Sequence, residues 1–277
     1  MKPDSIVYRV YNIWRGIHSS VFPKLFPYAF RPGRYTESFL SNGLTSTFVV
    51  REMTPVNRVI YCFWTGDNEM SVNRKKALDS LVADSGVEVR LITRDNWGDY
   101  ILAEDPLPSC FTMLSDVHKA DYLRTYFMHH YGGGYSDIKC PTHSWTESFD
   151  QLDANSNYWL LGYQEQSYKD VGNAHIKDKA LKRDLWIYHK NLVGNGAYIC
   201  RPETPFTEEW LNEAKRRLKE LTPVLYQHPA LDPYGKNADY PVPWTYILGE
   251  IFHPLCLKYH DRILVDNNLF PILYNYR

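Results

Sequence analysis

Cysteine is scarce in this sequence, and neither glycine nor proline is enriched. The 277 residues include five Cys, an odd number with no two close enough to form a CxxC pair. This spacing argues against a disulfide framework and against a structural zinc site, and it is typical of a reducing, cytoplasmic compartment. With 15 Gly and 17 Pro, the composition also excludes collagen-like and disordered chains.

Long apolar runs and an excess of one charge are absent as well. No run reaches the roughly 18 apolar residues that indicate a transmembrane helix, and the first residues lack the apolar segment and the cleavage site of a signal peptide. The 31 Lys and Arg balance 32 Asp and Glu, so no nucleic-acid partner is expected. We therefore expect a cytoplasmic protein, long enough for one large domain or two small ones.

Residues 1–36 differ in character from the rest of the chain. Asp4 is their only acid among several Lys and Arg, and apolar residues that include Trp14 recur at helical spacing. The pattern has two interpretations. Residues 1–30 form a helix on the inner face of an anionic membrane, or the helix packs on the protein's own core with a solvated basic face. Proline is expected to end this helix and to make residues 22–36 an irregular connector, at Pro23, Pro27 and Pro32.

Strand-like and helix-like segments alternate from residue 56 onward. Apolar β-branched runs predict strands, and apolar residues at helical spacing predict the helices between them. The expected strands are 58–64, 87–93, 135–138, 158–163 and 197–200, and the expected helices are 71–83, 95–102, 116–130, 204–221 and 245–259. This order is typical of an α/β domain with an open, mostly parallel sheet flanked by helices, here residues 37–277. In such sheets, ligands bind beyond the carboxyl ends of the strands.

The densest group of reactive side chains lies between residues 118 and 139. Asp121 and Arg124 are three residues apart on an expected helix, so they share a face. Three glycines, residues 132–134, then let the backbone come close to a ligand or to another strand, and a short strand delivers Asp137 at its end. Two plainer alternatives stay open: a surface ion pair worth about 0.3–0.5 kcal/mol, and a glycine turn that only ends the helix.

Residues 119–139 resemble the DXD signature of glycosyltransferase family 32, K-x-D-x-L-R followed by Y-G-G-x-Y-x-D-x-D. Residues 58–97 look like the first βαβ unit of that family, and residues 195–198 like its later active-site segment. The family is related to mannosyltransferases, to capsular polysaccharide glycosyltransferases and to glucosylating toxins. The resemblance implies a GT-A-type, Rossmann-like fold and a single catalytic domain that uses nucleotide sugars.

The resemblance also implies roles for the side chains that match the motifs of the family. Trp64 would stack on the nucleobase of the donor. Asp121 and Arg124 would hold hydroxyls of the donor sugar. Tyr135 would line the donor pocket, and Asn195 would lie near the transferred sugar.

Residue 139 departs from the signature. Asp137 matches its first Asp, which contacts the ribose and the metal site, but Lys139 stands where the second Asp ligates Mn²⁺ or Mg²⁺. A protonated Lys cannot ligate a metal, yet it can stabilise the charge of a leaving diphosphate. A metal-independent transferase with Asp137 and Lys139 as catalytic residues is therefore one interpretation. In the alternatives, Asp137 and a downstream His253 or Glu250 hold the metal, or Lys139 points away and the site is degraded.

Taken together, the resemblance implies a hexosyltransferase in polysaccharide or glycoconjugate synthesis. It would move a hexose from a UDP- or GDP-sugar to a hydroxyl of a glycan or lipid-linked acceptor, with retention of configuration. The basic, aromatic N-terminal segment favours an acceptor on a lipid carrier at a membrane surface. The alternative is a non-catalytic protein that binds nucleotide sugars or glycans and has a degenerate DXD site.

Overall fold

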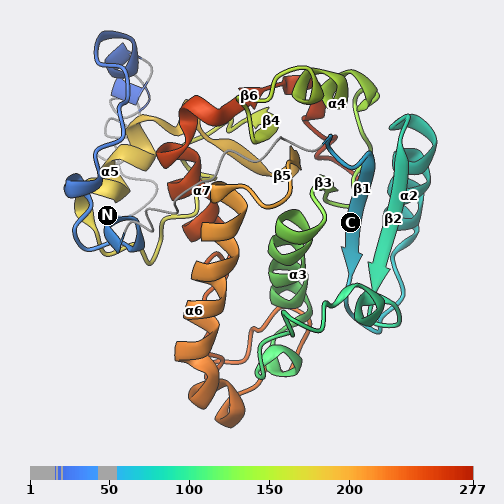
Figure 1. Cartoon of the computed structure of the whole chain (residues 1–277). Coiled ribbons are helices and arrows are strands. Elements are labelled where there is room, and N and C mark those ends of the chain that lie inside the picture. The colour runs from blue at the N-terminus through green and yellow to red at the C-terminus, as the bar shows by residue number, and fades with distance from the viewer. Residues whose placement is uncertain (1–15, 17, 20, 43–54, 277) are drawn as a thin grey trace, which may run out of the picture.

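A six-stranded sheet forms the centre of the molecule (Figure 1). The computed structural model describes residues 16, 18, 19, 21–42 and 55–276. Within them the strands lie in the order β2-β1-β3-β5-β4-β6. They are β1 (Val59–Trp64), β2 (Glu88–Thr93), β3 (Gly133–Ser136), β4 (Leu160–Gln164), β5 (Val193–Cys200) and β6 (Ile263–Val265).

One strand of this sheet is reversed. Strand β1 runs parallel to β2 and β3, and β4 runs parallel to β6. Strand β5 lies between β3 and β4 and is antiparallel to both. Five strands therefore share one direction, and the expected α/β class with a mostly parallel sheet between helices is confirmed.

Helices cover both faces of the sheet (Figure 1). Val59, Tyr61 and Phe63 of β1 pack into one core, and the intervening Ile60 and Cys62 pack into another. This alternation follows from the two-residue period of a strand, and it explains why β1 reads as a continuous apolar run. The larger core contains α3 (Asp116–His130), α5 (Lys179–Ile187), α6 (Pro205–Gln227) and α7 (Gly249–Lys258), and the smaller contains α2 (Val72–Asp84) and α4 (Thr146–Asp153).

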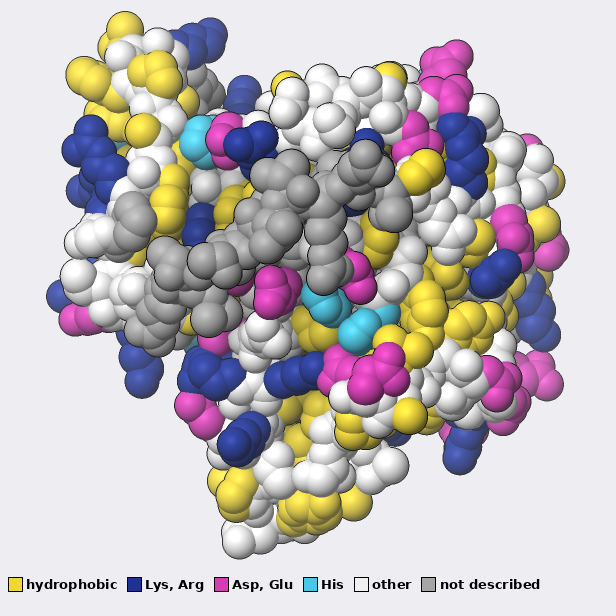
Figure 2. Space-filling view, in the orientation of Figure 1, with side chains coloured by type: hydrophobic (Ala, Val, Ile, Leu, Met, Phe, Trp, Pro, Cys, Tyr) yellow, Lys and Arg dark blue, Asp and Glu magenta, His cyan; other side chains and the backbone are white. Residues whose placement is uncertain are grey.

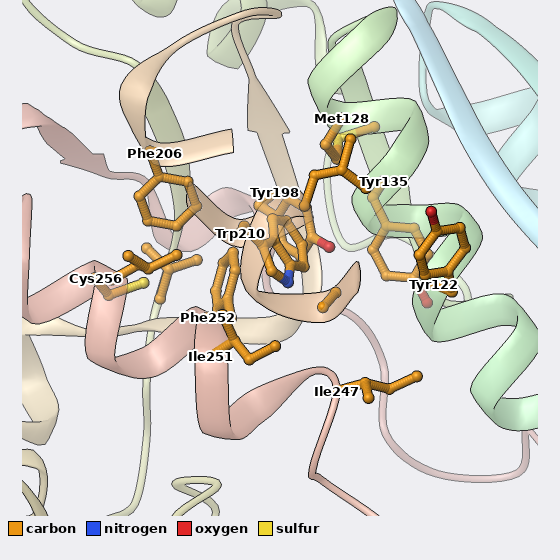
Figure 3. Packing of buried hydrophobic residues seen from close by; sticks show 14 of the residues in the cluster. Tyr122, Met128, Tyr135, Tyr198, Phe206, Trp210, Ile247, Ile251, Phe252 and Cys256 are labelled. Atoms are coloured by element: carbon orange, nitrogen blue, oxygen red, sulfur yellow. The ribbon is translucent and has the colours of Figure 1, made fainter. Parts of the chain in front are cut away.

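Aromatic side chains fill the larger core beside β5 (Figure 3). The ring of Tyr198 lies 5.2 Å from that of Tyr135 and 5.0 Å from that of Phe252, and Trp210 lies 4.8 Å from Phe252, between ring centroids. Such contacts add to the free energy of burial. They fix α6 and α7 against β5. The polar residues at the beginning of β5 are held in place by the same packing.

Several expected elements differ in extent. The segment 95–102 forms only a single 3-10 turn, Trp97–Tyr100. The helix expected at 245–259 begins at Gly249, since residues 241–248 form an irregular segment, and the helix expected to end at 221 continues to Gln227. Other 3-10 turns are Pro32–Arg34, Phe39–Asn42, Phe111–Met113, His189–Asn191, His260–Arg262 and Asn267–Leu269.

The N-terminal segment is anchored on α5 where it is described. Residues 21–25 are helical, and the amide of Phe26 donates to the carbonyl of Phe22 at 2.9 Å. Pro23 therefore does not end the helix, because a proline removes only its own donor. Further along, the Arg34 guanidinium donates to the Asp184 carboxylate at 2.5 and 2.9 Å. The expected irregular connector is thus helical at its beginning and held on α5 at Arg34, whereas residues 1–15, 17 and 20 of the predicted amphipathic helix lie outside the described residues.

The larger core continues across the predicted domain boundary at residue 36. Tyr35 and Leu40 are both buried in the larger core, on either side of it. The division into an extension and a catalytic domain stays a prediction. Within the described part of the chain, no helix combines the length and apolar character needed to cross a bilayer.

Candidate active site

Strands β3 and β5 bring two predicted site residues together. Asp137 follows the last residue of β3, and Asn195 lies near the beginning of β5. Because the two strands are antiparallel, the end of one meets the beginning of the other, and the amide of Asp137 donates to the carbonyl of Gly196 at 2.8 Å. The sheet therefore places Asp137 and Asn195 at one edge, as the ends of α/β strands predict.

Helix α3 adds Asp121 and Arg124 to this edge. The helix begins after Ser115, whose hydroxyl accepts from the amide of His118 and satisfies a free donor of the first turn. Arg124 donates to the Asp121 carboxylate at 3.1 Å and to the carbonyl of Asn195 at 2.9 Å. Asp121 is 3% exposed and Arg124 is 6% exposed. The alternative of an ordinary surface ion pair is therefore wrong.

Burial sets the charge state of Asp121. Loss of hydration in the core raises the pKa of this carboxyl to about 7, although the guanidinium of Arg124 acts in the opposite direction. Asp121 therefore binds a proton more readily than an exposed carboxyl does. Perturbed carboxyl groups of this kind gather at functional sites.

Tyr135 connects the two charged pairs. Its ring centroid lies 3.9 Å from the guanidinium carbon of Arg124, which is a cation–π contact. Its hydroxyl donates to one oxygen of Asp137 at 2.5 Å. Tyr135 is the third residue of β3, so the strand itself holds the ring between Arg124 and Asp137.

Lys139 points toward Asp137. Its ammonium donates to the second carboxylate oxygen of Asp137 at 2.8 Å, and its side chain is 12% exposed. Burial alone would raise the pKa of Asp137, but the positive charges of Lys139 and Arg124 outweigh it and hold the pKa below its ordinary value. Asp137 is therefore ionised at neutral pH, and the alternative in which Lys139 points away is wrong.

Both carboxylate oxygens of Asp137 have hydrogen-bond partners within the protein. One carboxylate oxygen accepts from Tyr135 and the other from Lys139. Among the residues that the structure describes, no three or more His, Cys, Asp and Glu gather in a way that could hold a metal ion. Glu250 instead accepts from the imidazole of His175 and from the hydroxyl of Thr245, both at 2.9 Å. A role for Mn²⁺ or Mg²⁺ stays a prediction.

His253 is a buried partner of Asn195. Its Nδ1 accepts from the amide of Gly172 at 3.0 Å, so a neutral ring carries its proton on Nε2. The Asn195 amide group lies 3.2 Å from Nε2, and its oxygen has no hydrogen-bond partner in the orientation shown. Turning the amide lets that oxygen accept the Nε2 proton. Burial lowers the pKa of His253 to about 4, which keeps the ring neutral. His253 thus positions Asn195.

Trp64 ends β1 at the same edge of the sheet but faces the smaller core. Its indole N–H donates to the carbonyl of Asn68 at 2.8 Å, and the ring is partly exposed. Phe63 faces the opposite way and lies 6.0 Å from the ring of Tyr135. Trp244, in the irregular segment before α7, is 57% exposed, and its ring lies 6.5 Å from that of His118.

Three residues near the site were missed from the sequence. Glu165 is 6% exposed, its carboxylate lies 3.7 Å from Nε2 of His253, and burial raises its pKa. Arg74 and Tyr276 lie beside Lys139. No local sequence pattern predicts these three residues at the site, because each is brought there from a distant part of the chain.

Comparisons with known proteins give little guidance. No family model matches the chain, and no curated protein matches it. One similar solved structure is the "PaToxG Glycosyltransferase", with 11% identity over 90% of this chain and 79% of that chain and a TM-score of 0.40. A similarity at this level indicates neither family nor activity. Membership of glycosyltransferase family 32 therefore stays a prediction.

Proposed function

We propose that the chain is a glycosyltransferase that moves a hexosyl group from a nucleotide diphosphate sugar to an acceptor hydroxyl. The observation that carries the proposal is the meeting of two charged pairs at one sheet edge. Asp121 and Arg124 form a buried pair, Asp137 and Lys139 form a partly exposed pair, and Tyr135 touches both. Carboxylate and guanidinium groups suit sugar hydroxyls, and a cation suits a diphosphate.

Each side chain then has a defined task. Asp121 and Arg124 hold hydroxyls of the donor sugar, with Asn195 beside the transferred ring. Lys139 lies next to the diphosphate and Asp137 fixes the direction of its ammonium. Trp64 offers its ring to the nucleobase. Catalysis depends on fixed positions and fixed charges, which lower the barrier because no reorganisation is needed during the reaction.

The proposed reaction retains configuration at the anomeric carbon. The bond between that carbon and the β-phosphate oxygen breaks, and the acceptor oxygen forms the new bond on the same face. The acceptor proton passes to the leaving phosphate. The ammonium of Lys139 stabilises the negative charge that grows on the diphosphate, in the place that a metal has in the DXD signature.

A panel of donors tests the proposal. Purified protein is incubated with UDP-, GDP-, CMP- and dTDP-sugars, in EDTA or in Mn²⁺, and nucleotide release is measured. We expect release from one UDP- or GDP-hexose that continues in EDTA. Release only in Mn²⁺ would contradict the role of Lys139, and the absence of both release and nucleotide binding would contradict the proposal as a whole.

Lys139 also gives the binding-only alternative a specific basis. A cation at the second position of the signature is bonded directly to Asp137, so both groups are satisfied without a substrate. A protein that only binds nucleotide sugars would show saturable binding by calorimetry with no nucleotide release, whether or not acceptors are added. That result would favour a binding protein over a transferase.

We further propose that the acceptor lies on a lipid carrier at a membrane surface. Hydrophobic side chains gather at the corner of the molecule that the first described segment occupies (Figure 2). Val21, Leu25 and Phe26 are 49%, 68% and 58% exposed there, next to the exposed Lys24. Apolar and cationic groups on one face are typical of helices that lie on anionic bilayers.

Liposome flotation tests this surface. Leu25→Glu with Phe26→Glu should abolish binding to vesicles of anionic phospholipid, because the change removes buried apolar area and adds negative charge. Val82→Glu is the matched control, since Val82 is 56% exposed on α2. Equal binding of the two variants, or no binding of the wild type, would contradict the proposal.

A further inference from the structure

The ring of Tyr276 contacts two cations from different parts of the fold. The guanidinium carbon of Arg74, in the first turn of α2, is 4.8 Å from the ring centroid. The ammonium of Lys139, just beyond β3, is 4.9 Å from the same centroid. The guanidinium of Arg74 also donates to the carbonyl of Ile138 at 2.7 Å, which fixes it beside the end of β3. Both cations therefore lie against one ring, close to the end of β3, and Lys139 is bonded to Asp137 as well.

Arg74 differs from the other cations of this group in having no acidic partner among the described residues. Asp121 is paired with Arg124, and Asp137 is paired with Lys139. Within the part of the chain that the structure describes, Arg74 forms no ion pair. The five side chains together carry one more positive than negative charge when all are ionised, and the surplus lies where Arg74 and Lys139 converge. Such a surplus suits a ligand with several negative charges.

The segment that carries Tyr276 lies at the surface of the molecule. The amide of Ile272 donates to the carbonyl of Cys140 at 3.0 Å, and the Thr142 hydroxyl lies 2.9 Å from the carbonyl of Phe270. Beyond these, Leu273 and Tyr274 are 50% and 73% exposed. Segments with few buried contacts open at low cost in free energy. Leu273 and Tyr274 bury little surface, so their displacement leaves the core covered.

We propose that Arg74 and Lys139 form a binding site for a diphosphate group, and that the ring of Tyr276 covers this site until the diphosphate displaces it. A phosphate oxygen forms charge-assisted hydrogen bonds with both cations, which are stronger than cation–π contacts at a partly exposed position. The ligand class is the diphosphate of a nucleotide sugar, and in this respect the inference rests on the proposed function.

Inorganic pyrophosphate tests the site without a sugar or a base. Its affinity is measured by calorimetry in EDTA for the full chain and its variants. Arg74→Ala and Lys139→Ala should each weaken binding at least tenfold, and Arg74→Lys should bind with intermediate affinity because it keeps the charge. Lys76→Ala is the control, since Lys76 is exposed on the same helix. Melting curves of each variant verify that it is folded.

The cover is tested by its own variants. Tyr276→Ala should bind pyrophosphate several-fold more tightly, because no ring has to leave, and Tyr276→Phe should bind like the wild type, because the cation–π contacts remain. Tyr274→Ala is the matched control at an exposed position of the same segment. Weaker binding of pyrophosphate by Tyr276→Ala would show that Tyr276 is a part of the site. It would contradict the proposal that its ring covers the site.

Failure of the site and failure of the proposed function are separable. A wild type that does not bind pyrophosphate, or an Arg74→Ala variant that binds it normally, overturns the site even where sugar donors are turned over. Loss of pyrophosphate binding in Arg74→Ala, with no donor turned over by the wild type, supports the site and overturns the transferase.

Discussion

At the scale of single residues, position 139 decides how the site handles charge. The carboxylate of Asp137 has a pKa below its ordinary value, with Lys139 as the main source of positive charge. An aspartate at position 139 would replace the attraction between Lys139 and Asp137 by repulsion between two carboxylates. A divalent cation relieves such repulsion by binding both groups.

Lys139→Asp should therefore convert a metal-independent site into a metal-dependent one. We expect the wild type to release nucleotide equally in EDTA and in Mn²⁺. The variant should lose most of its turnover in EDTA, by about a hundredfold as for the loss of one charge-stabilising donor, and recover part of it in Mn²⁺. Lys219→Asp, an exposed position on α6, is the charge-matched control. A wild type that EDTA inhibits would contradict this prediction.

Four of the site residues predicted from sequence share one property, whereas Asn195 was predicted from the resemblance alone. Asp121, Arg124, Tyr135 and Asp137 lie in one short stretch, so helix and strand periodicity bring them together without knowledge of the fold. Arg74 reaches the site from α2 and Tyr276 from the end of the described chain. Arg74 and Tyr276 reach the site through packing between distant segments, which no local sequence pattern predicts.

At the scale of elements, the junction between α3 and β3 depends on glycine. Gly133 has φ of +90°, and a Cβ added there would lie 2.7 Å from the carbonyl oxygen of Val59. Gly132, with φ of +61°, follows the last turn of α3, and its amide donates to the carbonyl of Phe127 at 3.0 Å. The glycines thus end the helix and also let β3 approach β1, so both functions foreseen from the sequence occur.

Gly133→Ala should destabilise the protein strongly. The unfavourable backbone conformation and the contact with β1 together cost on the order of 3 kcal/mol of unfolding free energy. Gly98→Ala is the control, because nothing lies within 4 Å of an added Cβ there, and it should change stability by less than about 0.5 kcal/mol. Urea unfolding measures both. Similar values for the two variants would show that β3 tolerates a wider separation from β1.

The elements missed from the sequence are the short or irregular ones. Strand β6 has three residues and α4 has eight, too few for a clear period. Strand β5 begins four residues before the expected strand because Gly194 and Gly196 weaken the strand pattern. Close packing explains these glycines, since a Cβ on Gly194 would overlap the ring of Tyr163 at 2.0 Å. Strand β1 was predicted because it is a continuous apolar run, and α3 because it is long and begins at a clear cap, Ser115.

At the scale of the whole molecule, buried and half-buried histidines contribute to its response to acid. Burial lowers the pKa of His118, His129 and His253 to about 4 each. The unfolded chain takes up protons at these positions from about pH 6.5 downward, whereas the folded protein does not. The stabilisation that these neutral histidines contribute to the free energy of unfolding is therefore fully present above pH 6.5. It is lost as the pH falls toward 4. Asp121 acts in the opposite direction, because its raised pKa favours proton uptake by the folded state.

His129→Gln should reduce this loss. His129 lies at the end of α3, with Nδ1 3.4 Å from the hydroxyl of Thr207, a contact that an amide can replace. Each histidine contributes on the order of 2 kcal/mol to the difference in unfolding free energy between about pH 7 and about pH 4. Urea unfolding at both pH values measures it. An identical loss in the variant and the wild type would contradict the assignment.

The reversed strand β5 joins two halves of the sheet, β2-β1-β3 on one side and β4-β6 on the other. Among the described strands, every ladder between the halves runs through β5. A ligand held by Arg124 and Asn195 would touch this strand where it begins. Amide hydrogen exchange of both halves should then slow together when a donor binds. Because β5 connects the two halves, binding of a ligand at the site could be detected from the amide exchange rates of the entire sheet.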